Sequence, residues 1–563
     1  MANSHTVLKI SRPNVEQQNK LSCALGISRV LAQVLINRGL SDIKQAEKFL
    51  RSDLNDLNDP WSFPDMARVV ARIKEAAARK ERVLILGDYD VDGITSVALL
   101  KETLKSIGIE AQHYIPHRLK EGYGLTSEIV AKIKDSNSGL IITADCGTNS
   151  FKEIQVLREW GIDVIVTDHH EASIRNLPKA VGIINPKVSG EKVFKDLAGV
   201  GVAFKLCQAL SEKNLFEKLD LVALGTVADV VPLLDENRII ARFGLANLSR
   251  TKRYGLKALM RSSRLRKRPI TTEMVSFILG PRLNASGRMD HAELSLRLLL
   301  SEQESEADKL AEALERCNRQ RQEVEGKILQ EALGIIEKEI DFKKHKIIVL
   351  AKESWHEGVL GVVAARLTER FNRPTILISL GQKLCKGSGR SIDNFHLFKA
   401  LVNCSGYLKS FGGHAHAAGL LIDRDNIDAF REQINRFAHQ CLMLEDLLPS
   451  LDIEAELNLA NLDFEVVRQL EMLEPFGPGN PPPLFFTRNL KLKGQPQILS
   501  RETLKFWVTD QNGSIFPAIG FGMAAFRENL IKAEFIDLVY IPRIDNWASY
   551  MGIILEIEDI FCR

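Results

Sequence analysis

Short hydrophobic runs alternate with amphipathic segments between about residues 81 and 235 of the chain. Five runs have the length and the β-branched content of buried strands, and segments with apolar residues at helical spacing separate most of them. This alternation predicts a mainly parallel sheet with helices on both faces. The expected strands are 83–86, 111–115, 140–143, 164–167 and 181–184.

The hydrophobic pattern changes on either side of this region and predicts further domains. A chain of 563 residues is too long for one hydrophobic core. Near residue 300 a single apolar stripe at helical spacing begins, and beyond residue 450 short strand-like runs alternate with turns. We expect an N-terminal helical cap (1–80), an α/β domain that ends in a basic helical segment (81–300), a connecting helix (301–342), a second α/β domain (343–445) and a small β-barrel (446–563).

Composition narrows the class of protein only slightly. Lysine and arginine number 75 against 72 acidic residues, so the net charge is +3 and any nucleic-acid surface must come from local clustering. The eight cysteines form no CxxC pair, which favours reduced thiols over disulfides or a zinc site. No signal peptide and no bilayer-spanning segment is evident. We therefore expect a soluble cytoplasmic protein with no membrane partner.

Three carboxylates follow the first expected strand directly. Asp88, Asp90 and Asp92 alternate with other residues just before a helix-like segment opens at Thr95. Ligands of open α/β sheets collect beyond the carboxyl ends of the strands, and acids this close repel one another unless a cation is present. Oxygen ligands suit Mg²⁺ or Mn²⁺. Taken alone, the stretch is equally compatible with a solvated acidic turn or a helix N-cap cluster.

Further acids and histidines recur at corresponding places. Asp145 follows the third strand, and Asp168, His169 and His170 follow the fourth. Asp229 lies in a later apolar segment, where an unpaired carboxylate would be costly to bury. Strands of one parallel sheet deliver such side chains to the same edge. The recurrence favours a shared metal centre over unrelated turns and caps.

Several other segments have the composition of phosphate-binding sites. Arg118 lies in a glycine-containing loop after the second strand, and a forked guanidinium contact there suits a terminal phosphate. Two glycine-rich motifs, 386–391 and 411–419, would let backbone amides approach phosphates. A turn-rich polar segment spans 280–288. Residues 251–270 contain a basic run without acids: Lys252, Arg253, Lys257, Arg261, Arg264, Arg266, Lys267 and Arg268.

In order and spacing, four motifs resemble those of the DHH phosphoesterase superfamily and, within it, the RecJ family of exonucleases. The motifs are Gly87-Asp88-Tyr89-Asp90-Val91-Asp92-Gly93, Asp145-Cys146-Gly147, Asp168-His169-His170 and Gly225-Thr226-Val227-Ala228-Asp229-Val230-Val231-Pro232-Leu233. The resemblance covers nearly the whole chain. It implies that residues 343–445 form a DHHA1 substrate-binding domain and that the terminal barrel is an OB-fold.

The resemblance also implies a set of metal ligands. It implies two divalent ions, Mn²⁺ or Mg²⁺, with Asp145 bridging them, His170 facing the scissile phosphate and Asp168 orienting the histidines. Many superfamily members carry a histidine where Leu86 stands here, which puts the coordination of one metal in doubt. The other implied ligands are Asp88, Asp90, Asp92, His169 and Asp229.

The nucleic-acid contacts follow from the same resemblance. Arg118, Ser388 and Arg390 would surround a 5′ phosphate, and His414 would face a phosphate. Single-stranded DNA would pass along the segment 280–288. The residues implied to line that path are Arg282, Asn284 and Arg288.

The function expected from these features is 5′→3′ exonucleolytic hydrolysis of single-stranded DNA with two metals, in repair and recombination. Two alternatives remain at this point: a phosphoesterase for short oligonucleotides or cyclic dinucleotides, and an inactive single-strand-binding scaffold. The basic run and the barrel disfavour the first, and the intact acids and histidines disfavour the second. A single-stranded-DNA-binding protein and a helicase are the partners that the family implies.

Overall fold

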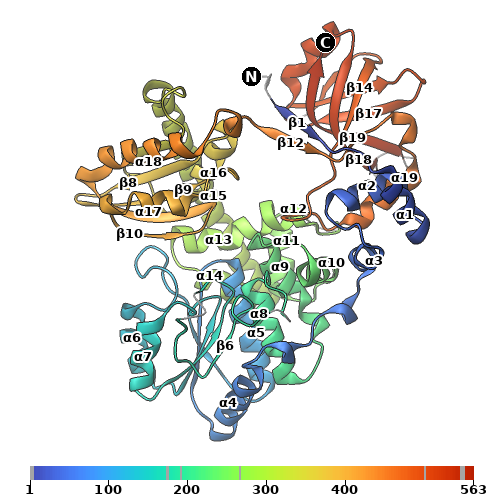
Figure 1. Ribbon diagram of the computed structural model, residues 1–563. Helices are drawn as coiled ribbons and strands as arrows, with labels where there is room; N and C mark the ends of the chain where they lie inside the picture. Colours follow the sequence, from blue (N-terminus) through green and yellow to red (C-terminus); the bar gives the residue numbers. More distant parts are fainter. Residues whose placement is uncertain (1–5, 173–175, 191–192, 266–267, 500–501, 546–551) are drawn as a thin grey trace. The chain divides into compact units, whose positions relative to one another are not determined.

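The computed structural model describes residues 6–172, 176–190, 193–265, 268–499, 502–545 and 552–563. The chain divides into two compact units (Figure 1). One unit is Asp56–Leu447, and the other combines Met1–Asn55 with Leu448–Arg563.

A five-stranded parallel sheet forms the first half of the Asp56–Leu447 unit. Its order is β3-β2-β4-β5-β6, and every neighbouring pair is parallel, as the alternating pattern predicted. All residues of β2 and β4 are buried, because helices cover both faces. The strands are β2 (Val83–Gly87), β3 (Gln112–Tyr114), β4 (Leu140–Ala144), β5 (Asp163–Thr167) and β6 (Gly182–Ile184).

The helices of this half form two layers around the sheet. Apolar residues of α6 and α7 pack on one face, while α5 and α8 contact the other. Most of α5 and nearly all of α9 is buried, although α5 carries polar residues such as Asp92 and Thr95. The helices are α4 (Met66–Arg79), α5 (Val91–Ser106), α6 (Ser127–Ile133), α7 (Phe151–Glu159), α8 (Gly199–Ser211), α9 (Leu219–Ala228), α10 (Asp235–Ser249) and α11 (Tyr254–Ser262).

The segment 280–288, expected to be rich in turns, is instead helical. It forms α13 (Gly280–Met289), directly after a π-helical turn at Val275–Leu279. Pro281 lies in the first turn of α13, where the π-helical turn joins it. The short helix α14 (Glu293–Leu299) follows, and the expected long helix is present as α15 (Glu304–Glu339).

A second sheet, of order β10-β11-β9-β8-β7, completes this unit. Only β7 and β8 are parallel; the other pairs are antiparallel. The strands are β7 (Ile348–Glu353), β8 (Thr375–Leu380), β9 (Leu384–Arg390), β10 (Leu408–Gly413) and β11 (Ala417–Asp423). The helices are α16 (Leu360–Phe371), α17 (Leu397–Asn403) and α18 (Ile427–Cys441).

The glycine-rich motif 386–391 lies mainly on strand β9 and is not a loop. Its glycines face the core, where a Cβ on Gly387 would lie 2.9 Å from the Leu420 side chain and one on Gly389 2.8 Å from that of Leu397. Alternation along the strand then places Ser388 and Arg390 on the opposite face. Close packing therefore accounts for these glycines better than backbone contact with phosphate does.

The other unit is a β-barrel joined by three N-terminal helices. Its seven-stranded sheet has the order β13-β14-β18-β19-β17-β16-β15, and an extra β14–β16 pairing joins strands distant in that order. The strands are β13 (Ala455–Glu456), β14 (Phe485–Leu492), β15 (Gln497–Leu499), β16 (Thr503–Thr509), β17 (Ile515–Gly520), β18 (Ile536–Asp545) and β19 (Gly552–Cys562). Helices α19 (Phe464–Leu470) and α20 (Arg527–Lys532) complete the unit.

Residues 1–80, expected as one N-terminal cap, are divided between the two units. The N-terminal strand β1 (Val7–Ile10) pairs in parallel with β12 (Ser450–Ile453). Helices α1 (Val15–Leu25), α2 (Arg29–Asn37) and α3 (Ile43–Arg51) share a hydrophobic core with the barrel, whereas α4 packs on the parallel sheet's unit. Among the described helices, none is both long and apolar enough to cross a membrane.

Candidate metal centre and phosphate-binding cluster

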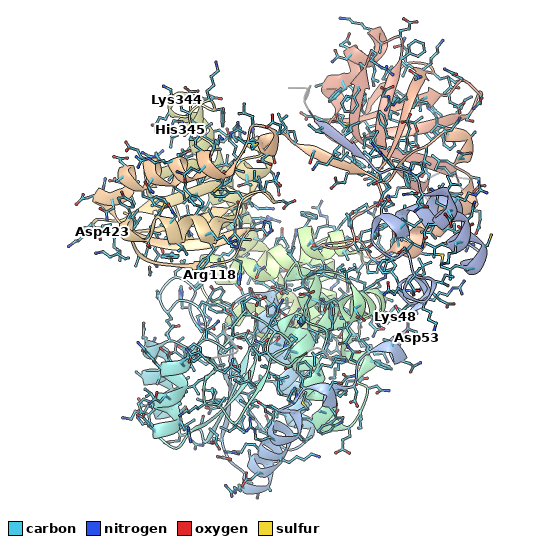
Figure 2. The ribbon with its side chains drawn as sticks, in the orientation of Figure 1. Lys48, Asp53, Arg118, Lys344, His345 and Asp423 are labelled. Carbon is cyan, nitrogen blue, oxygen red and sulfur yellow. The ribbon has the colours of Figure 1, made fainter. Side chains whose placement is uncertain are left out.

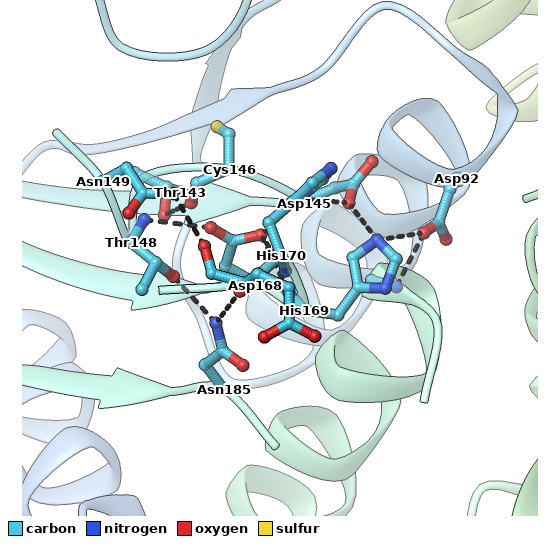
Figure 3. A network of polar contacts seen from close by, with 12 residues as sticks. Asp92, Thr143, Asp145, Cys146, Thr148, Asn149, Asp168, His169, His170 and Asn185 are labelled. Carbon is cyan, nitrogen blue, oxygen red and sulfur yellow. Dashed lines mark hydrogen bonds and ion pairs between the residues drawn. The ribbon is translucent and has the colours of Figure 1, made fainter. Parts of the chain in front are cut away.

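Acids and histidines from separate elements meet at the carboxyl edge of the parallel sheet (Figure 3). Among the described residues, three sets have ligand atoms within 4.8 Å of one another. Asp145 or His169 recurs in each set, so the sets form adjoining parts of one centre. The sets are Asp88, Asp90 and Asp145; Asp92, His169 and Asp229; and Asp145, His169 and His170.

His169 lies at the middle of this centre. Its Nε2 atom is 3.2 Å from Asp145 Oδ1, 3.5 Å from Asp229 Oδ2 and 3.8 Å from Asp92 Oδ2 (Figure 3 shows the Asp145 and Asp92 contacts). Asp229 comes from the C-terminal end of helix α9 and not from a strand. The ends of the parallel strands therefore account for the positions of the other acids. The position of Asp229 depends instead on where helix α9 ends.

The backbone fixes Asp145 and Asp92 from two directions. Asp145 has a left-handed conformation with φ 63°, and its N–H donates to Thr167 at the end of β5. Asp92 accepts from the N–H groups of Gly199 (2.6 Å) and Val200 (2.7 Å) at the start of α8. A Cβ on Gly199 would lie 2.6 Å from Asp145 Oδ1. A glycine at this position is therefore required for the two carboxylates to sit together.

The charges of the centre are not balanced by the protein. One oxygen each of Asp88, Asp145 and Asp229 is buried and has no hydrogen-bond partner among the described residues. Burial, and then the neighbouring carboxylates, raise the pKa of Asp88 and Asp145 well above the usual range. Burial likewise raises the pKa of Asp92 to about 6. Unpaired carboxylate oxygens at this density fit divalent cations.

Asp168 lies beside this set and has a different environment. It accepts hydrogen bonds from the backbone of Thr148, His169 and His170, and one of its oxygens is 2.8 Å from His170 Nδ1. Burial acts to raise the pKa of Asp168, but the contacts with His170 and Thr148 outweigh it and lower the pKa. Asp168 therefore stays ionised and orients the His170 ring.

Tyr123 is a site residue that the sequence did not reveal. Its hydroxyl donates to the Asp145 carbonyl (2.9 Å) and lies 3.0 Å from the His170 ring. The flanking glycines, both at positive φ, marked the loop, but no feature of the sequence marked the hydroxyl. On the far side of His170, the His414 ring from the second sheet is stacked at 6.5 Å between ring centroids. Burial and the charge of His170 lower the pKa of His414.

Arginines form a separate cluster beside the acids, where the two sheets of this unit meet (Figure 2 labels Arg118). Arg118 lies over the Tyr89 ring, 4.9 Å from its centroid. Burial and the charges of Arg118 and Arg390 lower the pKa of Arg288 to about 9. Arg390 lies 3.5 Å from the Ser388 hydroxyl. Three arginines that repel one another fit an anion such as a terminal phosphate.

Two residues expected along the DNA path bond within the protein. Arg282 donates to Glu315 (2.8 Å) and to the Ile278 carbonyl. Asn284 accepts from the N–H of Val91 (3.1 Å) at the start of α5. Asn284 therefore stabilises the start of α5, within the acidic motif.

Part of the basic run 251–270 forms ion pairs within the protein. For two of its arginines, this corrects the expectation that the run is available to contact a phosphate backbone. Arg253 is paired with Glu102 and Asp220, and Arg261 with Glu304 and Asp308. Their acidic partners lie elsewhere in the chain, so the positive charge of the run is unbalanced only within its own stretch of sequence. Arg266 and Lys267 of the run lie outside the described residues.

A parallel sheet with this acid and histidine set, joined through a long helix to a second small sheet, defines a phosphoesterase of the DHH class. Family models agree: the DHH family N-terminal domain matches residues 82–226, the DHHA1 domain 344–440 and the RecJ OB domain 453–559. These matches bear out the expected fold class.

Relatives that match nearly the whole chain identify the family within this class. The single-stranded-DNA-specific exonuclease RecJ of Bacillus subtilis (strain 168) is 37% identical over 98% of this chain and 70% of its own length. The Escherichia coli (strain K12) enzyme of the same name is 34% identical over 98% of this chain and 99% of its own. The crystal structure of RecJ in complex with Mn²⁺ from Thermus thermophilus matches with a TM-score of 0.85 and 28% identity, covering 99% of this chain and 80% of that one. The chain belongs to the RecJ family.

Proposed function

We propose that this chain is a single-stranded-DNA-specific exonuclease that hydrolyses phosphodiester bonds with two divalent metal ions. The observation that carries the proposal is the adjoining ligand sets, which share Asp145 and His169 and leave buried carboxylate oxygens without hydrogen-bond partners among the described residues. Relatives named as single-stranded-DNA-specific exonucleases and a related structure in complex with Mn²⁺ support it. A structure in complex with Mg²⁺ is similarly related.

The residues divide into two ligand groups. Asp88 and Asp90 would hold one metal ion, Asp92, His169 and Asp229 the other, and Asp145 would contact both. When bound, two such ions activate a water molecule and neutralise charge that develops on the phosphate. No protein nucleophile is needed.

His170 is placed to act on the substrate itself. The ionised Asp168 lies 2.8 Å from its Nδ1 and orients the ring. His170 then donates a hydrogen bond to an oxygen of the scissile phosphate, where negative charge grows during attack. The Tyr123 hydroxyl, 3.0 Å from the same nitrogen, also restrains the ring.

The arginine cluster sets the polarity of cleavage. Arg118, Arg288 and Arg390, with Ser388, would hold a terminal 5′ phosphate, and cleavage then proceeds 5′→3′ by mononucleotides. A terminal phosphate carries more charge than an internal one, so half-buried arginines select it. His414, across from His170, would contact the phosphate chain.

A single strand labelled at either end, with or without a 5′ phosphate, tests the proposal. In Mn²⁺ we expect that a 5′ label leaves as a mononucleotide while a 3′ label stays on shortening strands, and that EDTA stops both. Binding without cleavage would establish the scaffold instead. Cleavage limited to very short oligomers would establish a small-substrate phosphoesterase.

The cellular setting is also proposed. A cytoplasmic enzyme of DNA repair and recombination would receive its strands from a helicase and from a single-stranded-DNA-binding protein. Copurification of either protein with this chain, retained after nuclease treatment, would test direct association.

A further inference from the structure

A cavity of about 610 Å³ lies beside the metal centre, and both sheets of the Asp56–Leu447 unit contribute to its walls. The parallel-sheet side supplies Asn149, Tyr123 and His170. The second sheet's side supplies Phe398 near the start of α17 and His414 in the β10–β11 turn. None of the roles proposed above uses Phe398 or Asn149.

The cavity and the arginine cluster lie beside different strands of the two sheets. Along β3-β2-β4-β5, Arg118 follows β3, whereas Asn149 and Glu171 of the cavity follow β4 and β5. Along β10-β11-β9, Arg390 is on β9, whereas the cavity takes the β10–β11 turn. The acids that follow β2 and β4 lie between. For a strand with its 5′ phosphate on the arginines, the direction past the metal centre leads to this cavity.

The chemistry of the walls suits a nucleobase better than a phosphate. Neither lysine nor arginine lines the cavity among the described residues. Phe398 is half-buried and packs against Phe411, with ring centroids 5.7 Å apart, so its ring is held in place. Asn149 donates one amide hydrogen to the Glu171 carbonyl at 3.0 Å. An aromatic ring held by a second ring is a stacking platform for bases of any sequence.

We propose that this cavity binds the base of the nucleotide on the 3′ side of the scissile bond, stacked on Phe398. The inference rests on the proposed function, since it places the substrate relative to the metal centre. The stacked base fixes the sugar–phosphate link between the first two nucleotides against the metal centre. Correct placement of the scissile phosphate then depends on a base at the second position and not only on the 5′ phosphate.

Abasic substrates test the inference in the full-length protein with Mn²⁺. Three 5′-phosphorylated strands are compared in single-turnover release of the first nucleotide: one normal, one abasic at the second nucleotide, and one abasic at the first. For the wild type, loss of the second base is expected to slow release by roughly tenfold, in line with the usual strength of base–aromatic stacking.

Variants of Phe398 assign the effect to this ring. Phe398→Leu keeps apolar volume but removes the ring, so it is expected to slow the normal strand by roughly tenfold and to abolish the penalty of the second abasic position. Phe398→Trp should restore that penalty. The penalty at the first position should be the same in both variants as in the wild type. Val402→Ala, at an exposed position of the same helix, is the matched control.

Each outcome separates the inference from the proposed function. If the wild type releases no nucleotide from the normal strand, the proposed function fails. If it releases nucleotides but tolerates the second abasic position, or if Phe398→Leu keeps the full penalty, the inference is wrong and the proposed function stands. The wild-type comparison needs no variant, so it decides even if Phe398→Leu does not fold.

Discussion

At the scale of single residues, the centre is defined by acids that the protein alone does not stabilise. Buried oxygens of Asp88, Asp145 and Asp229 have no hydrogen-bond partner among the described residues, and the pKa of each carboxyl is raised by burial and by its neighbours. Placing such groups together costs stability unless a cation balances them. These acids therefore destabilise the metal-free fold locally, and metal binding should remove that destabilisation.

This destabilisation predicts that metal binding raises the stability of the protein by an amount that depends on pH. The folded pKa of Asp92 is raised from 3.8 to about 6, so within that window the folded chain holds a proton that the unfolded chain has lost. The free energy of unfolding of the chelated protein therefore falls as pH rises through the window, and the raised pKa values of Asp88, Asp145 and Asp229 act in the same direction. Metal ligands must be ionised, so Mn²⁺ should raise the Tm more at about pH 8 than at about pH 5.5. An equal or larger rise at the lower pH, measured by calorimetry, would contradict this.

At the scale of elements, the start of α8 brings two acids together. The Gly199 N–H bonds Asp92, and its missing side chain leaves room for Asp145. Gly199→Ala should therefore reduce Mn²⁺ affinity and nuclease rate by at least about tenfold, within the range seen when groups that orient metal ligands are altered. Titration calorimetry and a nuclease assay measure the two effects.

Gly201→Ala provides the matched control on the same helix. A Cβ at Gly201 would lie 3.2 Å from the end of the flexible Leu197 side chain, and none of the acids is among its nearest neighbours. Near-wild-type Mn²⁺ binding is expected. If both variants behave alike, the effect of Gly199→Ala belongs to the helix and not to the metal centre.

Strand β16 of the barrel gives a second test at this scale. Side chains alternate along it, so Phe506 is 1% exposed in the core while Trp507 is 41% exposed. Trp507→Ala should weaken binding of single-stranded DNA by roughly tenfold through lost stacking, with little change in Tm. Phe506→Ala should lower the free energy of unfolding by about 3–5 kcal/mol. Fluorescence anisotropy with a labelled strand and denaturant unfolding measure these effects; the reverse pattern would exclude a DNA-binding role for Trp507.

At the scale of the whole molecule, the sequence predicts local order better than long-range pairing. The five parallel strands are distinct hydrophobic runs, and α15 has a strong helical periodicity. Because parallel strands bring their ends to one edge, most of the acids could be grouped from the sequence. The strand pattern could not place Asp229, because its helix reaches the centre from outside the sheet; the cost of burying an unpaired carboxylate and likeness to a family grouped it with the others.

Other site features could not be predicted because they depend on contacts between distant segments. The role of Gly199 lies in its distance from Asp145, and that of Tyr123 in a loop that crosses to His170. Arg253 looked free because its partner Glu102 is remote in the sequence. The pairing of β1 with β12, which joins the N-terminal segment to the barrel unit, left no signal in a four-residue strand.

The two-metal centre itself is tested by counting the Mn²⁺ ions bound per chain in the wild type and in Asp145→Asn, with the nuclease rate measured on the same samples. Asparagine keeps the shape of the side chain but removes the charge that both ligand groups share. We expect two ions for the wild type, loss of at least one in the variant, a fall in rate of at least about 10³-fold, and a higher Tm in EDTA because a buried charge is gone. A variant that binds two ions and retains most of its nuclease activity would contradict the shared role of Asp145 and, with it, the two-metal centre.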